Sequence, residues 1–297
     1  MMNVGVVGIG KMGRPIADRL ITACYDVAIC NRSENAGVRS LRDRGASVRA
    51  SAADLAAASE VVLTALPTED SVRQVYAEMS LVAGAGQVYV DHSTVSPALN
   101  RHCADLLAAR GAAFLDAPVS GGPAGAEAGT LTVMVGGDEA VFKRALPAFE
   151  AFGSKIRLCG PVGAGQAIKL VNQYLVAVHT LAASEAAALA MRLGADLGTV
   201  GDVVGTSFGT SAMLLRNLPR FTARDFSPAT PVGLIAKDLA IIHTEAVDAG
   251  VPLLLGGLVE QCYLEAKARG WAGEDMSALV KFWDRQASAP DDQESSG

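Results

Sequence analysis

Short apolar segments alternate with amphipathic helical segments along the first half of the chain, and this alternation most constrains its fold. Helical patterns occupy residues 12–23, 69–79 and 97–110. Strands that alternate with helices are typical of βαβ units, in which helices cover a parallel sheet. The sequence therefore predicts an α/β domain with a doubly wound sheet. Its strands are expected at residues 3–8, 26–30, 61–65, 87–90, 113–116, 132–135 and 155–159.

The pattern changes at residues 160–163, where glycine and proline interrupt it and the strand signals end. A helix is expected at residues 167–193, which would be about 40 Å long at 1.5 Å per residue. That length is large for one domain, so we predict a long inter-domain helix followed by an all-α C-terminal domain. Further helices are expected at 197–204, 211–217, 231–249, 253–269 and 276–285.

Two domains agree with a chain of 297 residues, because a single hydrophobic core seldom serves so many. The predicted boundaries are residues 1–161 for the α/β domain and 162–287 for the helical domain. The small, polar and acidic tail at 288–297 is predicted to be disordered.

Composition excludes several classes of protein. Half of the residues are apolar, the net charge is −6, and no basic cluster is visible, which argues against binding of nucleic acid. The five cysteines are scattered and contain no Cys-x-x-Cys, so they indicate a reducing compartment and no metal site. Residues 1–7 run directly into a strand, so no signal peptide is expected. No stretch of about 18 uncharged apolar residues predicts a membrane span. We expect a soluble, cytoplasmic protein.

A glycine-rich segment lies between the first expected strand and the first expected helix. Its first glycine allows a tight turn, its second lets the backbone approach a pyrophosphate, and its third lets helix and strand pack closely. The helix N-terminus adds free N–H groups and a positive dipole end. The segment therefore predicts a dinucleotide site, with a glycine-rich turn that binds nothing as the alternative. Its residues are Gly8, Ile9, Gly10, Lys11, Met12 and Gly13.

The end of the second strand suggests which dinucleotide is bound. Asn31, Arg32 and Ser33 stand where an acidic residue would favour NAD(H). Asn31 can bond a ribose hydroxyl, while Arg32 and Ser33 can bind a 2′-phosphate. We predict a preference for NADP(H), with NAD(H) possible. The alternative is that Arg32 is a solvated surface arginine.

Two later strand ends lie at the edge where such sheets bind ligands. Leu66 and Pro67 follow one of these strands and Thr94 follows the other. We predict that these three residues contact the nicotinamide half of the cofactor. His92 is expected to be a structural histidine rather than a catalytic one.

The loop at residues 116–123 is a candidate substrate site. Ser120, Gly121 and Gly122 can present successive N–H groups and a hydroxyl to the carboxylate of a small substrate. An ordinary turn is the alternative. Asp116 could be a carboxylate that caps this loop instead of a catalytic acid.

Lys169 is the candidate acid or base. It lies near the start of the long apolar helix, with Asn172 and Gln173 three and four residues later, so the three side chains can face one pocket. A positioned lysine can exchange a proton with a substrate hydroxyl, and the two amides can orient both groups. The alternative is a lysine that extends from the helix to water.

These segments together resemble the β-hydroxyacid dehydrogenase family over nearly the whole chain, residues 3–284. The likeness rests on ordered motifs at residues 8–13, 116–122 with 129–132, 163–173 and 237–239. It implies an N-terminal Rossmann domain and hydride transfer between the nicotinamide cofactor and a small hydroxy acid or semialdehyde acid. The substrate would be of the 3-hydroxyisobutyrate, tartronate semialdehyde or threonate type.

The resemblance also implies roles for single residues. Lys169 would be the catalytic lysine, Lys237 would lie near the cofactor, and the carboxylate anchors would be Ser120, Gly121 and Gly122. It further implies a homodimer or homotetramer built through the helical domain.

Two departures from the family pattern bear on the substrate. Gln173 stands where many members have asparagine, and residues 206–211 lack a tryptophan associated with hydroxyisobutyrate enzymes. Both argue against hydroxyisobutyrate, and the presence of Lys169 argues against imine reduction. Two other functions stay open, namely a noncatalytic NADP-binding scaffold and a reductase of aldehydes that lack a carboxylate.

Overall fold

The computed structural model describes residues 2–284, which form two compact units. The first unit ends at Asn172 and the second begins at Gln173. The expected tail at 288–297 lies outside the described residues.

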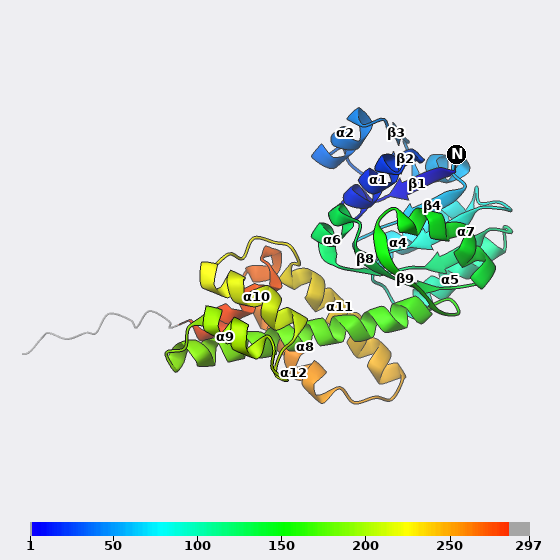
Figure 1. The fold of residues 1–297 in the computed structure, drawn as a ribbon. Helices are drawn as coiled ribbons and strands as arrows, with labels where there is room; N and C mark the ends of the chain where they lie inside the picture. Colours follow the sequence, from blue (N-terminus) through cyan, green and yellow to red (C-terminus); the bar gives the residue numbers. More distant parts are fainter. Residues whose placement is uncertain (1, 285–297) are drawn as a thin grey trace, which may run out of the picture. The chain divides into compact units, whose positions relative to one another are not determined.

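The first unit alternates strands and helices, as Figure 1 shows. Its strands are β1 (Asn3–Val7), β2 (Asp26–Cys30), β3 (Ser47–Val48), β4 (Val61–Thr64), β5 (Val88–Asp91), β6 (Ala113–Asp116), β7 (Val119–Ser120), β8 (Leu131–Gly136) and β9 (Gly153–Gly160). Its helices are α1 (Gly13–Thr22), α2 (Ala36–Asp43), α3 (Ala52–Ala57), α4 (Glu69–Ser80), α5 (Pro97–Ala108), α6 (Gly122–Ala128) and α7 (Glu139–Glu150).

The strands form one sheet in the order β3-β2-β1-β4-β5-β6-β8-β7, and β9 pairs with β8. The strands from β3 to β6 in this order are parallel, whereas β8 is antiparallel to both β6 and β7. The chain reverses its direction of travel across the sheet between β1 and β4. Such a switch point leaves a crevice at the carboxyl ends of the strands. The predicted α/β, doubly wound fold is confirmed.

Alternate strand residues face opposite layers, because side chains in a strand have a period of two. Val88 and Val90 belong to the core under α1, α2, α6 and α7, while Tyr89 between them belongs to the core under α3, α4 and α5. Both faces are therefore apolar, as a parallel sheet covered on both sides requires. Polar side chains lie instead at the strand ends, as Thr64, Asp91 and Asp116 do.

The seven expected strands are present, with ends shifted by at most two residues. Two short strands were not expected. Of these, β7 lies inside the loop at 116–123 and pairs with β8 through Val119 and Ser120. A pair of residues carries no alternation pattern, so only its pairing with a distant strand defines it as a strand.

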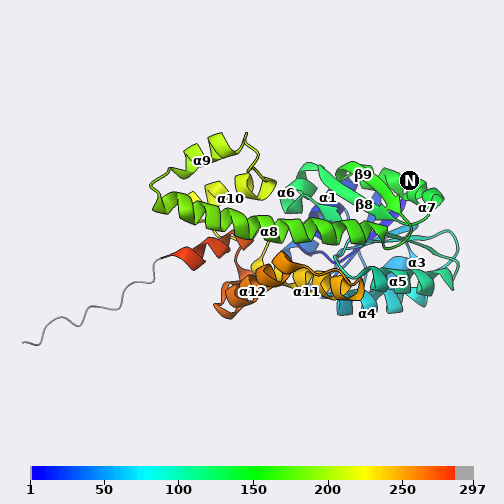
Figure 2. The ribbon, with the colours of Figure 1, turned by 90° about the horizontal axis from the view of Figure 1, so that it is seen from below.

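Helix α8 (Ala164–Arg192) is unbroken and contains the bond that joins the two units. It matches the helix expected at 167–193, and it can be followed along its length in Figure 2. By length and composition α8 could cross a membrane, and 44% of its most apolar window is buried inside the protein.

The second unit is helical throughout its described part, apart from one isolated bridge between Pro231 and Asp275. Its core includes Ala187 of α8, Phe221 of α10 and Val280 of η2. The expected all-α domain is thus confirmed. Besides the later part of α8, it contains α9 (Leu197–Val204), α10 (Ala212–Ala223), α11 (Val232–Asp248), α12 (Leu254–Ala268) and two 3₁₀ helices, η1 (Trp271–Gly273) and η2 (Met276–Trp283).

A buried ion pair supports the helical unit. Asp275 is buried and accepts two hydrogen bonds from Arg216 at 2.9 and 2.8 Å. It also accepts from the backbone N–H groups of Thr230 and Ser277. Burial raises the pKa of Asp275, but these hydrogen bonds and the guanidinium charge outweigh it and hold the pKa well below its usual value. The carboxylate thus joins α10 to the residues just before α11 and to the start of η2.

Candidate active site

The carboxyl ends of β1, β4, β5 and β6 lie side by side at one edge of the sheet. The pairing register places Val7 beside Thr64, Thr64 beside Asp91, and Asp91 beside Asp116. The candidate residues before position 130 follow the ends of β1, β2, β4, β5 and β6. Candidate residues from separate strands therefore lie at one edge of the sheet.

The three glycines of the first loop occupy three different environments. Gly8 has φ +94°, and a Cβ there would lie 2.5 Å from the carbonyl oxygen of Ala65. A Cβ on Gly13 would lie 1.9 Å from the Gly8 oxygen, so this glycine allows close packing of α1 on β1. Gly10 is exposed and has no atom within 4 Å of its Cβ position.

The start of α1 is suited to an anion. Met12, at the N-cap, makes no side-chain capping bond, and the first turn contains no acidic residue. The Arg14 and Ile16 N–H groups donate to backbone carbonyls, and no side chain caps this helix N-terminus next to the open backbone at Gly10. A dinucleotide pyrophosphate fits both features.

Two asparagines hold the glycine loop in place. Asn31 Oδ1 accepts from the Ile9 N–H at 2.9 Å, and Asn35 Nδ2 donates to the Ile9 carbonyl at 3.2 Å. Asn31 also donates to the Ser33 carbonyl. The side chain expected to bond the ribose thus supports the loop backbone. Asn35 was not among the predicted residues, although an asparagine before the helical segment of α2 is an N-cap signal, and it does cap that helix through Val38.

The end of β2 is open to solvent. Arg32 and Ser33 are exposed, and within residues 2–284 the Arg32 guanidinium makes no hydrogen bond or ion pair with another side chain. The neighbouring acid, Glu34, is paired with Arg42 at 3.1 Å. Glu34 is therefore engaged by Arg42 rather than by the neighbouring Arg32.

A buried carboxylate organises the ends of β4 and β5. Asp91 accepts from the Thr64 hydroxyl at 2.8 Å, from the Ser93 N–H at 3.0 Å, and from Asn100 Nδ2 at 3.1 Å. Burial raises the pKa of Asp91, and these hydrogen bonds partly oppose that rise. Ser93 Oγ in turn accepts from the Leu66 N–H at 2.9 Å. The loops that carry the predicted nicotinamide contacts are therefore joined, a connection that no local pattern revealed.

His92 is a structural residue. Its Nδ1 lies 2.6 Å from the Ala117 carbonyl oxygen, and its ring lies edge-on to Phe149 and Phe152. Burial lowers the pKa of His92 to about 4, so the imidazole is neutral near pH 7. Only Nδ1–H can donate to the Ala117 carbonyl, and this tautomer leaves Nε2 in the core.

Asp116 joins the end of β6 to the start of α8. It is fully buried, and its carboxylate accepts from the backbone N–H groups of Gly163 at 2.7 Å and Gln166 at 2.9 Å. Burial raises the pKa of Asp116, and the backbone amides oppose the rise. A Cβ on Gly165 would lie 2.3 Å from the Met134 oxygen, which explains a glycine there. Asp116 is therefore a capping carboxylate, and it caps α8 rather than the loop at 118–123.

Lys169 is buried one turn beyond this cap. Lys169 is only 7% exposed, and its Nζ donates to the Val119 carbonyl at 2.8 Å. The Val119 carbonyl belongs to the peptide unit that continues into Ser120. The structure thus places the candidate acid or base against the candidate carboxylate site. A lysine buried to this degree does not extend from the helix to bulk water.

The three proposed carboxylate anchors lie at the turn from β7 into α6. Ser120 is half-buried, and Gly121 and Gly122 have φ of +128° and +63°, values that L residues rarely adopt. Asn172 lies on α8 one turn beyond Lys169 and is half-buried.

The helical unit contains the remaining candidates. Gln173 Nε2 donates to Asp238 Oδ2 at 2.6 Å, and Lys237 Nζ lies 2.9 Å from Asp238 Oδ1. Asp238 is buried, so it fixes Gln173 of α8 against α11. In the motif at 237–239 the sequence points to Lys237, whereas in the structure Asp238 binds Gln173.

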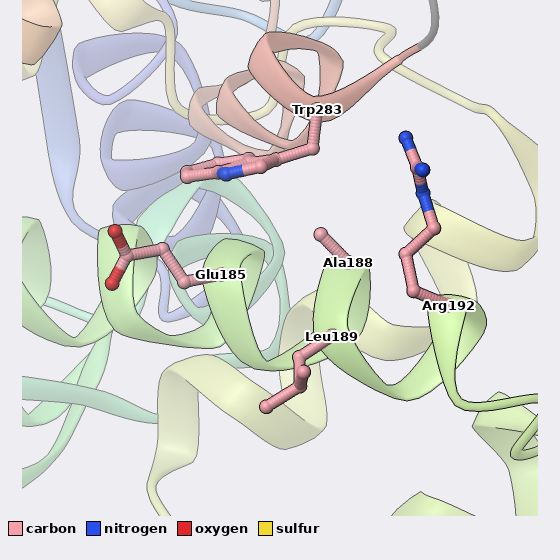
Figure 3. A pocket seen from close by; sticks show the side chains of 5 residues that line it. All are labelled: Glu185, Ala188, Leu189, Arg192 and Trp283. Carbon is pink, nitrogen blue, oxygen red and sulfur yellow. The ribbon is translucent and has the colours of Figure 1, made fainter.

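A hollow of about 280 Å³ lies elsewhere in the helical unit. In Figure 3 the Trp283 ring lies over α8, with Glu185 and Arg192 on either side of Ala188. Glu185 is 16 residues beyond Lys169 on the same helix, or roughly 24 Å along its axis. The hollow contains none of the predicted site residues.

Two family models match the chain in sequence. Residues 3–160 match the NAD binding domain of 6-phosphogluconate dehydrogenase, and residues 163–283 match the NAD-binding domain of NADP-dependent 3-hydroxyisobutyrate dehydrogenase.

Whole-chain relatives agree with these matches. A 2-(hydroxymethyl)glutarate dehydrogenase from Eubacterium barkeri is 34% identical, over 96% of this chain and 95% of its own. An L-threonate dehydrogenase from Cupriavidus necator is 33% identical, over 95% and 96%. The solved structure of a Mycobacterium tuberculosis 3-hydroxyisobutyrate dehydrogenase with L-serine superposes with a TM-score of 0.88, at 32% identity over 96% of this chain and all of its own.

The fold, the glycine loop and these matches define an NAD(P)-dependent oxidoreductase. The chain belongs to the β-hydroxyacid dehydrogenase family.

The two glycines Gly10 and Gly13 should respond differently to alanine. Gly10→Ala should keep the melting temperature of the wild type but weaken cofactor binding, because its Cβ enters open space where the pyrophosphate would approach. Gly13→Ala should lower the melting temperature, because its Cβ meets the Gly8 oxygen. Thermal unfolding and fluorescence titration with NADPH measure the two effects. Unchanged cofactor affinity in a folded Gly10→Ala variant would place the dinucleotide elsewhere.

Proposed function

We propose that this protein transfers a hydride between a nicotinamide cofactor and a small hydroxy acid, with Lys169 as the general acid and base. The observation that carries the proposal is the contact between Lys169 Nζ and the Val119 carbonyl, which places a buried amine beside Ser120. The nicotinamide, when bound, supplies or accepts the hydride. The protein must then bind the acid, hold its carbinol carbon in position and move one proton.

The Ser120 hydroxyl and the backbone N–H groups of Gly121 and Gly122 would bind the substrate carboxylate. Lys169 would take the hydroxyl proton during oxidation and return it during reduction. Its charge would also stabilise an alkoxide as it forms. Asn172 and Gln173 would orient the hydroxyl by hydrogen bonds without adding charge. Fixing the carboxylate and the hydroxyl together determines which face of the carbon reacts.

Two other functions are less well supported. A noncatalytic scaffold would have no need for a buried lysine beside a loop of this kind. A reductase of simple aldehydes would have no need for the three anchors, and its KM would be insensitive to loss of the Ser120 hydroxyl. Among carboxylate substrates, Gln173 argues against the hydroxyisobutyrate type, and the relative from Cupriavidus necator is named for L-threonate.

Lys169→Ala tests the proposed chemistry. We expect kcat to fall by at least roughly 100-fold, the low end for loss of a positioned acid or base. Affinity for the cofactor should change little, because Lys169 is assigned to the proton and not to the dinucleotide. Initial rates and NADPH titration measure the two quantities. Near-native turnover in this variant would remove Lys169 from the mechanism.

For the cofactor, we propose that NADP(H) is preferred over NAD(H). Support comes from the exposed Arg32 and Ser33, from the absence of an acid at the end of β2, and from the engagement of Glu34 by Arg42.

Arg32→Ala should reduce kcat/KM for NADP by roughly tenfold, equivalent to about 1.4 kcal/mol of lost charge-assisted binding. The same value for NAD should stay within about twofold. Arg39→Ala, an exposed arginine on α2, is the matched control and should alter neither value. A lower KM for NAD than for NADP in the wild type would contradict the preference.

For the assembly, we propose a homo-oligomer formed through the helical unit. An exposed apolar patch follows the end of α11 and the start of α12, with Leu254 86% exposed and Val247 65% exposed. Its other members are Val251, Leu255 and Leu258. Exposed apolar side chains gathered in one stretch of the chain support an interface there.

Leu258→Glu should shift the protein towards the monomer in analytical ultracentrifugation, because a charge would be buried in the interface. Leu81→Glu changes an equally exposed leucine in the first unit and should leave the mass unchanged. A wild-type protein that sediments as a monomer would contradict the assembly.

A further inference from the structure

Gln166, in the first turn of α8, makes contacts that the chemistry above does not use. It is fully buried. Its backbone N–H donates to Asp116, and its side-chain Nε2 donates to the Ser93 carbonyl. One residue therefore joins the capped start of α8 to the loop after β5.

Ser93 is hydrogen-bonded both to Gln166 and to the loop of the proposed cofactor site. Its hydroxyl accepts from the Leu66 N–H at 2.9 Å, and its own N–H donates to Asp91 at 3.0 Å. Leu66 itself lies against the Gly8 turn, because a Cβ on Gly8 would be 3.1 Å from Leu66 Cδ2. A continuous series of contacts thus runs from the glycine loop to the helix that carries Lys169.

Gln166 and Lys169 are three residues apart, so they lie on neighbouring positions of one helix face. A shift at Gln166 must move Lys169, since both belong to the same rigid first turns. The bond between the Gln166 amide and the Ser93 carbonyl therefore acts together with the Asp116 cap in setting the distance between Lys169 and the loops at Leu66 and Ser93.

The oxygen of the Gln166 amide is in a different situation from its nitrogen. Gln166 Oε1 is buried and has no hydrogen-bond partner among residues 2–284. A buried acceptor without a partner disfavours folding and offsets the gain from the bond to Ser93. The bond to Ser93 thus fixes the direction of the Gln166 side chain through one of its two polar atoms.

We propose that Gln166 is a positioning residue for hydride transfer, which holds Lys169 in register with the cofactor loops at Ser93 and Leu66. The inference rests on the proposed function, because it assigns Gln166 an effect that acts through Lys169.

Gln166→Met tests it by removing both polar atoms at similar volume. We expect kcat to fall by about tenfold or more, because small displacements of a reacting group are costly. Cofactor KM and melting temperature should stay close to those of the wild type. Gln87→Met is the matched control, since the Gln87 amide also donates to backbone carbonyls, those of Ala56 and Ser59, next to the start of β5. It should lower the melting temperature and leave kcat unchanged.

A double-mutant cycle with Lys169→Ala separates positioning from general damage. In the Lys169→Ala background, Gln166→Met should cause no further loss of kcat, because the group that Gln166 positions is gone. An equal loss in both backgrounds, or wild-type kcat in Gln166→Met, would overturn the inference. Near-native turnover in Lys169→Ala alone would instead overturn the proposed function.

Gln166→Glu provides a second test if the methionine variant does not fold. Ser93 requires a donor, which a protonated carboxyl supplies and an ionised carboxylate does not. Its kcat, relative to the wild type, should therefore decline as the pH rises and recover towards wild-type values as the pH falls. A ratio that does not depend on pH would contradict the role.

Discussion

The bond from the Asp116 carboxylate to the first turn of α8 determines where the rest of the proposed site lies. Asp116 ends β6, so its position is set by the sheet, and it accepts from the N–H groups of Gly163 and Gln166. A carboxylate at a helix N-terminus satisfies orphan donors and interacts favourably with the helix dipole. Because the cap fixes the start of α8, it also fixes Lys169 one turn later.

The neighbouring carboxylate, Asp91, holds the loops after β4 and β5, which carry the predicted nicotinamide contacts. Asp91 and Asp116 are register partners on adjacent strands, and both are fully buried. Each is bound by neutral hydroxyl, amide or backbone donors rather than by a cation. Burial raises the pKa of both carboxyl groups, and the hydrogen bonds restrain the rise. Two polar clusters thus support the loops that follow β4, β5 and β6.

Much of the fold was predictable because its signals are local. Apolar alternation identified the strands, and the loss of that alternation after residue 160 identified the helical unit. The glycine spacing predicted a tight turn at Gly8 and close packing at Gly13, and the structure contains both.

The contacts that could not be predicted join residues far apart in sequence. Lys169 and its acceptor Val119 are 50 residues apart, and Gln173 and Asp238 are 65 apart. Asn31 illustrates the same limit, because its residue type suited a ribose hydroxyl while the folded chain uses it to hold Ile9. Residue types indicate what a side chain can bind, whereas the fold decides which partner it meets.

The proposed reaction is the oxidation of a small alcohol that carries a carboxylate, at the carboxyl ends of the sheet strands. It is tested most directly by the absorbance of reduced nicotinamide when NADP and a panel of substrates are mixed with the enzyme. The panel should contain threonate, 3-hydroxyisobutyrate and the alcohol isobutanol, which lacks the carboxylate. We expect reduction of NADP with at least one acid and none with isobutanol. Equal rates with isobutanol, or no reduction with any hydroxy acid and either cofactor, would contradict it.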